Sequence, residues 1–377
     1  MSFVLETVDP AAAGLRLEQI ERMNGLIERH IADGRYPGAQ VAIARHGKLA
    51  FTRNYGLARI APALPARDET LWRLYSNTKV ITAAAIWLLV EDGLLSFNDR
   101  VAEHIPEFAR NGKGGITILQ VLTHQAGFPN APVMPPESWE DHQLLKRLVS
   151  DYTLEWTPGS RLHYHSYSAH WVLALAIEAL TKMDFRAFIR SRIIEPLGLG
   201  SELYVGIDEQ DQTRCAEMYE PAPDGKSHKL IEAENTIAFR RAGIPSGGGF
   251  ATARAMAAFY QMLLAGGTLH GKRILSPRMV QYVTRNFTAE RPDAGMGEIA
   301  MHRGLGPHSR GIGDVIRGLG SIAHPGTFGH GGVGSSYCWA DPDSGTSFAY
   351  ISNSKLPDPW HSRRLELISN CIHAAIV

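Results

Sequence analysis

A serine and a lysine stand three residues apart at the start of an apolar segment, and this spacing suggests nucleophilic chemistry. The stretch YSNTKVITAAAIWLLVEDG, residues 75–93, contains Ser76 and Lys79. If the segment is helical, both side chains lie on nearly the same face, about 4.5 Å apart along the axis. A serine hydroxyl needs a base to take its proton, and a lysine is such a base only when its ammonium is destabilised. Burial and the positive end of a helix dipole both lower a lysine pKa, and we expect both at Lys79.

The spacing alone has an ordinary explanation, because serine is a favoured helix N-cap and a lysine side chain can extend to water. The sequence contains a second match, Ser352-Asn353-Ser354-Lys355. It follows a predicted strand and runs into LPDP, where a helix cannot continue. We therefore interpret the second match as incidental and keep Ser76 and Lys79 as the candidate pair.

Two further segments carry side chains that fit the same chemistry. Tyr164 follows a Pro-Gly turn in WTPGSRLHYHSYSAHW and precedes an apolar helix. His330-Gly331-Gly332 precedes a predicted hairpin, where glycines let another backbone or a ligand approach closely. Taken separately, a core tyrosine and an ordinary turn explain both segments equally well.

Taken together and in this order, the three segments resemble the S-x-x-K, Y-x-(N/S) and (K/H)-(T/G)-G motifs of the serine β-lactamase and penicillin-binding protein superfamily. The stretch ITILQVLTHQAGF, residues 116–128, is similar to the class C β-lactamase-like branch. Other stretches that resemble this branch are EDGLLSFNDRVAEHIPEF (91–108), IIEPLGL (193–199) and GGGFATARAMAAF (247–259). The resemblance runs from about residue 41 to residue 353, and such collinearity is specific.

The resemblance implies roles for particular residues. Ser76 would be the acylated nucleophile, and Lys79 and Tyr164 would share the general-base work. The backbone N–H groups of Ser76 and Val333 would form the oxyanion hole. A phenolate beside an ammonium would be stabilised, so we expect Lys79 and Tyr164 to titrate as a unit.

The chain departs from the penicillin-recognising pattern at two positions, and these departures bear on the substrate. The third motif usually has a lysine and a hydroxyl that hold the antibiotic's carboxylate, whereas this chain has His330-Gly331-Gly332. A histidine is mostly neutral at pH 7. The second motif usually ends in asparagine, and here Ser166 takes that place. We expect Ser166, His330, Gly331 and Gly332 to contact substrate, with weaker recognition of a carboxylate-bearing peptide or lactam.

His-Gly-Gly or Trp-Gly-Gly at the third motif is typical of family VIII carboxylesterases. The resemblance therefore implies a serine hydrolase, most of all a carboxylesterase that cleaves small or medium acyl esters through an acyl-enzyme. An amide, β-lactam or D-amino-acid peptide hydrolase on the same scaffold is the alternative, as is an acyltransferase. A non-catalytic binding protein is the third hypothesis, although such a protein has no need for a desolvated lysine. No complete G-x-S-x-G elbow competes with this assignment.

The surrounding sequence predicts the elements that position these residues. A helix is expected at 15–32, two strands at 40–44 and 48–55 with a turn at His46-Gly47, a helix near Ala253, a hairpin around 341–345 and a helix at 361–376. The pattern between 70 and 240 is mostly helical. We therefore predict an α/β chain of the α+β type, in which helices flank an antiparallel sheet from both chain ends. The single catalytic domain, 1–377, would combine a sheet part (1–69 and 241–377) with an inserted helical part (70–240), and the ligand cleft would lie between them.

Composition limits the partners. The chain has 377 residues, with 38 Lys plus Arg and 38 Asp plus Glu, so no net field favours nucleic acid or an anionic membrane. The longest apolar run, residues 80–90, is too short to span a bilayer. The N-terminus has no signal-peptide pattern, and Cys215, Cys338 and Cys371 are odd in number and far apart. We expect a cytoplasmic enzyme for a small-molecule ester, with no nucleic-acid or membrane partner.

The remaining motifs are weaker. His163 with His165, or His302 with His308, has no HExxH or Cys/His spacing, so no metal or other cofactor is expected. We interpret His165 as a solvent-facing side chain. The Gly-rich PSGGGF lacks the residues of a phosphate-binding loop and is expected to provide close packing. Residues 128–139 and 303–327 either wall the acyl pocket or form surface loops, and the sequence does not decide between these.

Overall fold

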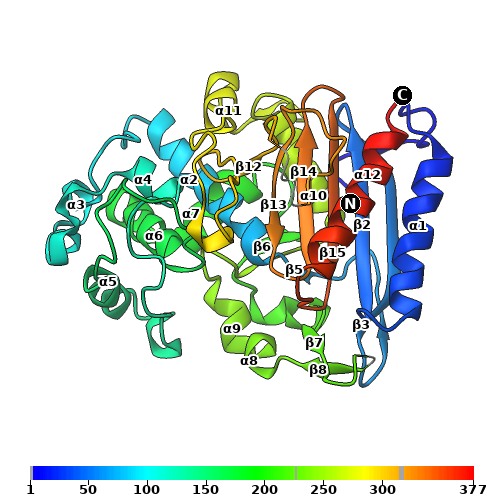
Figure 1. Ribbon diagram of the computed structural model, residues 1–377, viewed down its shortest axis with the longest axis horizontal. Coiled ribbons are helices and arrows are strands. Elements are labelled where there is room, and N and C mark those ends of the chain that lie inside the picture. Colours follow the sequence, from blue (N-terminus) through cyan, green and yellow to red (C-terminus); the bar gives the residue numbers. More distant parts are fainter. Residues whose placement is uncertain (1–2, 226, 314–317) are drawn as a thin grey trace.

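The computed structural model describes residues 3–225, 227–313 and 318–377. Within these residues the main sheet has eight strands in the order β1-β3-β2-β15-β14-β13-β12, with β4 paired to β3 (Figure 1). The strands come from both ends of the chain, as predicted. Their bounds are β1 Glu6–Thr7, β2 Gly38–Arg45, β3 Lys48–Arg59, β4 Leu64–Pro65, β12 His308–Ser309, β13 Phe328–Gly332, β14 Ser336–Asp341 and β15 Thr346–Ser352. The pairing is antiparallel as predicted, except that the short β1 runs parallel to β3.

The two predicted hairpins form the centre of this sheet. β2 and β3 turn at His46-Gly47, where both residues have positive φ, +50° and +79°. Two consecutive positive φ angles are what a tight hairpin turn requires. β14 and β15 form the second hairpin, and β15 pairs with β2, which joins the N-terminal and C-terminal parts of the chain.

The outer face of the sheet is covered by the two terminal helices, α1 (Leu17–Ala32) and α12 (Trp360–Ala375), drawn in blue and red at the right of Figure 1. On β2, Val41 and Ile43 belong to this outer core, whereas Ala42 and Ala44 belong to the inner one. Successive strand residues point to opposite faces, so the alternation shows that both faces are buried. The terminal helices therefore belong to the folding core of the sheet.

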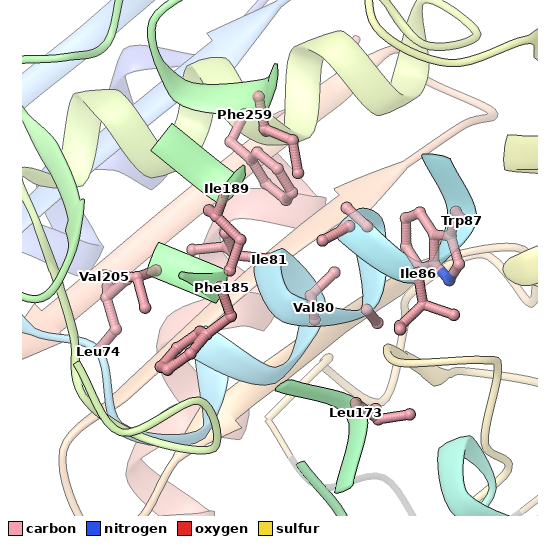
Figure 2. Close-up of a cluster of buried hydrophobic side chains, with 14 of the residues drawn as sticks. Leu74, Val80, Ile81, Ile86, Trp87, Leu173, Phe185, Ile189, Val205 and Phe259 are labelled. Carbon is pink, nitrogen blue, oxygen red and sulfur yellow. The ribbon is translucent and has the colours of Figure 1, made fainter. Parts of the chain in front are cut away.

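The inner face packs against α10 (Ala253–Leu264), which lies next to β2, β14 and β15, and α2 (Thr78–Glu91) packs into the same core. Figure 2 shows Val80, Ile81, Ile86 and Trp87 of α2 surrounded by side chains from other elements. Each such fully buried side chain contributes about 1.5–3 kcal/mol. Lys79 is 0% exposed at the start of the same helix.

Most of the helical part lies on the side of the molecule away from α1 and α12 (Figure 1). Its helices are α3 Val101–His104, α4 Ile118–Leu122, α5 His142–Ser150, α6 Ser168–Thr181, α7 Phe185–Ile189, α8 Glu232–Asn235 and α9 Ile237–Ala242, and α11 Pro277–Val283 follows α10. Short helical turns occur at η1 Tyr75–Asn77, η2 Pro106–Gly115, η3 Pro136–Ser138, η4 Arg190–Ile194, η5 Glu209–Arg214 and η6 Ala294–Met296. The division of the chain at residues 70 and 240 stays a prediction.

The chain between β4 and β12 also contains short strands that the sequence pattern did not indicate. β5 Trp72–Arg73, β6 Leu203–Val205 and β9 Gly249–Ala251 form a three-stranded sheet, and the pairs β7 Tyr219–Pro221 with β8 His228–Leu230 and β10 Thr268–Leu269 with β11 Lys272–Arg273 are separate ribbons. Strands of two or three residues are too short to show a period, so only tertiary pairing reveals them. Among the described helices, none has the length and apolar character needed to cross a bilayer.

Candidate active site

Ser76 lies in the single turn η1, two residues before α2 begins at Thr78. The sequence pattern had placed it in the helix itself. The preceding residue, Tyr75, has a positive φ of +46°, an uncommon and strained conformation for a side chain of this kind. The hydroxyl of Tyr75 donates a hydrogen bond to the Glu234 carboxylate, and the guanidinium of Arg73 lies 3.9 Å from the Tyr75 ring centroid. Arg73 and Glu234 also form a buried ion pair. These contacts hold the backbone conformation that presents Ser76.

Lys79 lies directly behind the serine. Its Nζ is 3.1 Å from Ser76 Oγ, 2.8 Å from the carbonyl oxygen of Ser166 and 2.9 Å from that of Ser246. A neutral amine has two N–H donors and one lone pair. The two carbonyl oxygens accept the two N–H groups, so the lone pair is left for the proton of Ser76.

The electrostatic environment favours this neutral amine. Burial lowers the pKa of Lys79 well below its usual range, and the positive charge of Arg303 lowers it further. No carboxylate of the described residues forms an ion pair with Lys79. The sequence implied a desolvated lysine beside a serine, and this condition is present. The charge of Arg303 lowers the pKa of Lys79 further.

Tyr164 contacts the serine from the other side. Its hydroxyl is 2.9 Å from Ser76 Oγ, and burial raises the pKa of Tyr164 to about 12, although the hydrogen bond to Ser76 and the charge of Arg303 act in the opposite direction. The pKa of Lys79 is lowered and the pKa of Tyr164 is raised, so the neutral amine and the neutral phenol are favoured at neutral pH. In that form Tyr164 donates to Ser76 Oγ and Ser76 donates to Lys79, so one continuous set of hydrogen bonds connects the three residues.

The third motif forms strand β13, which pairs with β12 and β14 and passes next to η1. Gly332 approaches the backbone so closely that a Cβ there would be 2.6 Å from the Leu74 carbonyl oxygen and 2.4 Å from Ser336 Oγ. Val333 follows, and both Val333 and Ser76 line the same pocket. The close approach of the two segments thus brings both residues expected to form the oxyanion hole to the same pocket.

His330 does not provide a charge at this wall. It is buried, and burial lowers its pKa to about 3, which leaves the ring neutral at pH 7. Its ring centroid is 4.1 Å from that of His308 and 6.3 Å from that of Tyr164. The neutral histidine that the sequence predicted is thus packed among other rings.

A pocket of about 480 Å³ opens beside these residues. All the positions expected to contact substrate border it, namely Ser166, His330, Gly331 and Gly332. Apolar and aromatic side chains supply much of the remaining wall, among them Tyr75, Tyr167, Met296, Met301, Tyr337, Leu356 and Leu365. None of residues 128–139 lines this pocket, and within 303–327 His308 does. The pocket thus suits a small, mainly apolar substituent.

The expectation for His165 is wrong. Its side chain is 0% exposed, Nδ1 lies 2.6 Å from the His163 carbonyl oxygen, and Nε2 accepts the Phe128 N–H at 3.2 Å. It therefore connects the loop that carries Tyr164 to the segment after α4. The alternation of polar side chains in LHYHSYS gives no indication of this burial, because the loop has no regular period.

The second serine–lysine match is non-helical, as predicted. Ser352 ends β15, and Lys355 Nζ forms an ion pair with Glu234 Oε1 at 3.0 Å. Lys355 nevertheless lines the pocket, a position that its sequence context did not indicate. It contributes a pocket wall rather than a base.

The sequence missed several residues that contact the catalytic candidates. Ser246, in the Gly-rich PSGGGF, supplies a carbonyl to Lys79, while Gly249 of the same segment packs against Thr78, as its close-packing role predicts. Asp293 and Arg303 contact Tyr164 from a loop without a recognisable motif. Only the fold brings such residues to the site.

Two clusters in the described residues have the atoms to hold a metal ion, Asp99 with Glu103 and His104, and His142 with Glu178 and Asp184. The histidine pairs singled out in the sequence belong to neither cluster. Neither cluster borders the pocket beside Ser76. The geometry at Ser76 by itself supports nucleophilic attack, with a base and a proton donor within hydrogen-bond distance.

Comparison with known proteins identifies relatives over almost the whole chain. The Beta-lactamase family model matches residues 23–369. The Esterase/beta-lactamase LipL of Mycobacterium tuberculosis is 29% identical over 350 residues, which cover 85% of this chain and 78% of the relative.

Two solved structures are similar in fold. A penicillin-binding protein homologue from Caulobacter crescentus superimposes with a TM-score of 0.82 at 26% identity, covering 96% of this chain and 99% of the other. A family VIII carboxylesterase gives a TM-score of 0.81 at 26% identity, with the same coverage. The arrangement of sheet and helices predicted from the sequence is therefore that of this fold.

Proposed function

Because this chain belongs to the Beta-lactamase family, a serine hydrolase family, we propose that it is a carboxylesterase that cleaves small or medium acyl esters through an acyl-enzyme on Ser76. The observation that carries the proposal is the position of Ser76 Oγ, 3.1 Å from Lys79 Nζ and 2.9 Å from the Tyr164 hydroxyl. The hydroxyl thus has both an acceptor for its proton and a donor beside it. The family VIII carboxylesterase of the same fold and the relative named as an esterase support the choice of an ester.

Acylation begins when Ser76 Oγ attacks the ester carbonyl carbon and its proton moves to Lys79 Nζ. The backbone N–H groups of Ser76 and Val333 receive the oxyanion of the tetrahedral intermediate. The intermediate collapses as the C–O bond to the alcohol breaks. The leaving alkoxide takes the proton of Tyr164, so the acyl-enzyme contains a phenolate and an ammonium.

Deacylation returns both protons to their starting atoms. The Tyr164 phenolate takes a proton from water as the water oxygen attacks the acyl carbon. When the second tetrahedral intermediate collapses, Ser76 Oγ takes the proton from the Lys79 ammonium, and the carboxylic acid leaves. Lys79 is then neutral and Tyr164 is again a phenol, as in the resting site.

The pocket favours an ester over a lactam or peptide with a carboxylate. The place of the third-motif lysine is occupied by His330, whose pKa of about 3 leaves it neutral. A hydrogen bond to a charged group contributes about 1.5–3 kcal/mol, so its loss weakens binding of the carboxylate. An ester with an apolar acyl group has no carboxylate, so its binding does not depend on that hydrogen bond.

A paired assay tests this function. With purified protein, we expect kcat/KM for p-nitrophenyl butyrate to exceed that for a chromogenic cephalosporin by about 10²-fold, because the third motif has no fixed cation. Rapid lactam turnover without ester turnover would instead assign the chain to the amide and lactam hydrolases.

Added methanol separates hydrolysis from acyl transfer, because a transferase releases methyl butyrate in place of butyric acid.

A second prediction concerns the close contact of β13 with η1. Gly332→Ala places a Cβ 2.6 Å from the Leu74 carbonyl oxygen, which forces β13 away from the turn that carries Ser76. A misplacement of about 1 Å costs up to about 10²-fold in rate, so we expect kcat on the ester to fall by about 10-fold or more. Gly115→Ala is the matched control, because a Cβ there meets nothing within 4 Å. Unchanged kcat in Gly332→Ala would show that β13 does not shape the oxyanion site.

A cytoplasmic location and a small-molecule ester as the partner remain part of the proposal. The three cysteines, Cys215, Cys338 and Cys371, are all free thiols, which accords with a reducing compartment. Fractionation of the native host with an antibody to the chain tests the location.

A further inference from the structure

A buried arginine–aspartate pair lies behind Tyr164. Arg303 is 2% exposed and Asp293 is 0% exposed. The Nε of Arg303 donates to Asp293 Oδ2 at 3.1 Å, and Nη2 donates to the same oxygen. Asp293 Oδ1 in turn accepts the backbone N–H of Tyr164 at 3.0 Å. The pair is therefore connected directly to the residue that contacts Ser76.

The orientation of Arg303 is fixed on its other side by His308. Arg303 Nη1 lies 2.9 Å from His308 Nε2, and a guanidinium can only donate, so His308 Nε2 is the acceptor. The proton of the ring is then on Nδ1, which lies 3.1 Å from the Tyr337 hydroxyl. With both ends held, the guanidinium carbon stands 4.8 Å from the centroid of the Tyr164 ring.

Four histidines near Lys79 and Tyr164 contribute no charge at neutral pH. They are His124 after α4, His165 beside Tyr164, His170 on α6 and His330 on β13, and burial is the largest cause of the lowered pKa in each. Tyr167 and Asp293 act on Tyr164 in the direction of a higher pKa. The Arg303 guanidinium carbon lies 4.8 Å and Lys79 Nζ lies 5.0 Å from the same Tyr164 ring centroid, so the charge of Arg303 acts on both members of the pair.

We propose that Arg303 is a positioning residue for the Ser76 site, whose fixed positive charge keeps Lys79 in its basic form and stabilises the Tyr164 phenolate of the acyl-enzyme. The inference rests on the proposed function, because both effects matter only if Lys79 and Tyr164 transfer protons. A cation near an amine disfavours protonation of the amine, and a cation near a phenol favours loss of the phenol proton. The same charge therefore assists both proton transfers.

The pH profile of the ester reaction tests this role. In Arg303→Met we expect the acid limb of kcat/KM to move about one unit toward higher pH, because the lysine regains basicity when the cation is lost. Arg303→Lys retains a charge and should restore the limb toward the wild-type position. The double variant Arg303→Met/Asp293→Asn removes the unpaired carboxylate that the single variant leaves, and its limb should move upward by less. A uniform loss of kcat with an unmoved limb in all three variants would show a merely structural role.

A second measurement does not depend on esterase activity. The Cε signal of Lys79 in protein labelled with ¹³C-lysine, assigned by its loss in Lys79→Arg, reports the protonation of that amine. We expect its titration midpoint to rise in Arg303→Met and in the double variant. An unchanged midpoint overturns the role of Arg303 even if the protein hydrolyses esters. A raised midpoint in a protein without Ser76-dependent ester hydrolysis confirms the charge effect on Lys79 and places the error in the proposed function.

Discussion

Ser76→Ala should lower kcat/KM for p-nitrophenyl butyrate by at least about 10³-fold, because no other hydroxyl stands within reach of both proton-transfer groups in the described site. The folded structure should be unaffected, since among the described residues the Ser76 hydroxyl hydrogen-bonds only with Lys79 and Tyr164. Thermal unfolding of the variant checks this. The residual activity measures what binding and the oxyanion site contribute without a nucleophile.

The acyl-enzyme gives this prediction a direct readout. Wild-type protein mixed with the ester and quenched in acid should show, by intact-protein mass, an added butyryl group on Ser76, and Ser76→Ala should not. Ser352→Ala is the matched control, since Ser352 begins the second serine–lysine match and donates its hydroxyl to the Ser335 carbonyl oxygen. It should keep activity within a few-fold of wild type. Full esterase activity in Ser76→Ala would show that another residue is the nucleophile.

Removal of the Lys79 amine should have the second largest effect. Lys79→Met keeps the length and apolar stem but has no lone pair for the Ser76 proton, so we expect a loss of about 10²–10⁴-fold in kcat. Lys79→Arg keeps a cation, which stays protonated at all accessible pH values, and should be equally inactive. If Lys79→Arg retained wild-type rates, the amine would act through its charge and not as a base. Circular dichroism and thermal unfolding establish that both variants fold.

The pH dependence of the wild-type enzyme follows from the same assignment. Only the neutral amine accepts a proton, so kcat/KM should rise with pH through the pKa of Lys79 and then level off. Burial and Arg303 hold this pKa well below the usual range of a lysine, so the plateau should include neutral pH. Tyr164, with a pKa of about 12, should remain a phenol throughout that range. A rate that continues to rise far into alkaline pH would mean that Lys79 is protonated in the resting enzyme.

The reaction type was predictable from local sequence because its requirements are local. Residues three apart at a helix start must lie on one face, so Ser76 and Lys79 were placed together without a structure. The apolar run after them predicted burial, and burial supplies the largest part of the lowered pKa of Lys79. The hairpin turn at His46-Gly47 was equally local, because a glycine between two strand-like runs readily adopts the positive φ that such a turn requires.

Tyr164 and the third motif were placed by their resemblance to a family, and only the fold brings them to Ser76. Tyr164 lies 88 positions from Ser76 in sequence, and no spacing rule connects residues so far apart. The burial of His165 and the pocket position of Lys355 were missed for the same reason. Each depends on packing against a distant segment, Phe128 for His165 and Glu234 for Lys355.

The sequence by itself thus determined a serine with a desolvated lysine behind it, and the fold class that presents them. The tertiary structure decided the protonation state of Lys79 beside Ser76, because the charged side chains that act on it come from elsewhere in the chain. Arg303 and Asp293 lie more than a hundred residues from Tyr164 and have no motif, yet they set the electrostatic field at its ring. Electrostatic interactions act through space over several ångströms in a low-dielectric interior, and their sources are therefore found only when the chain is folded.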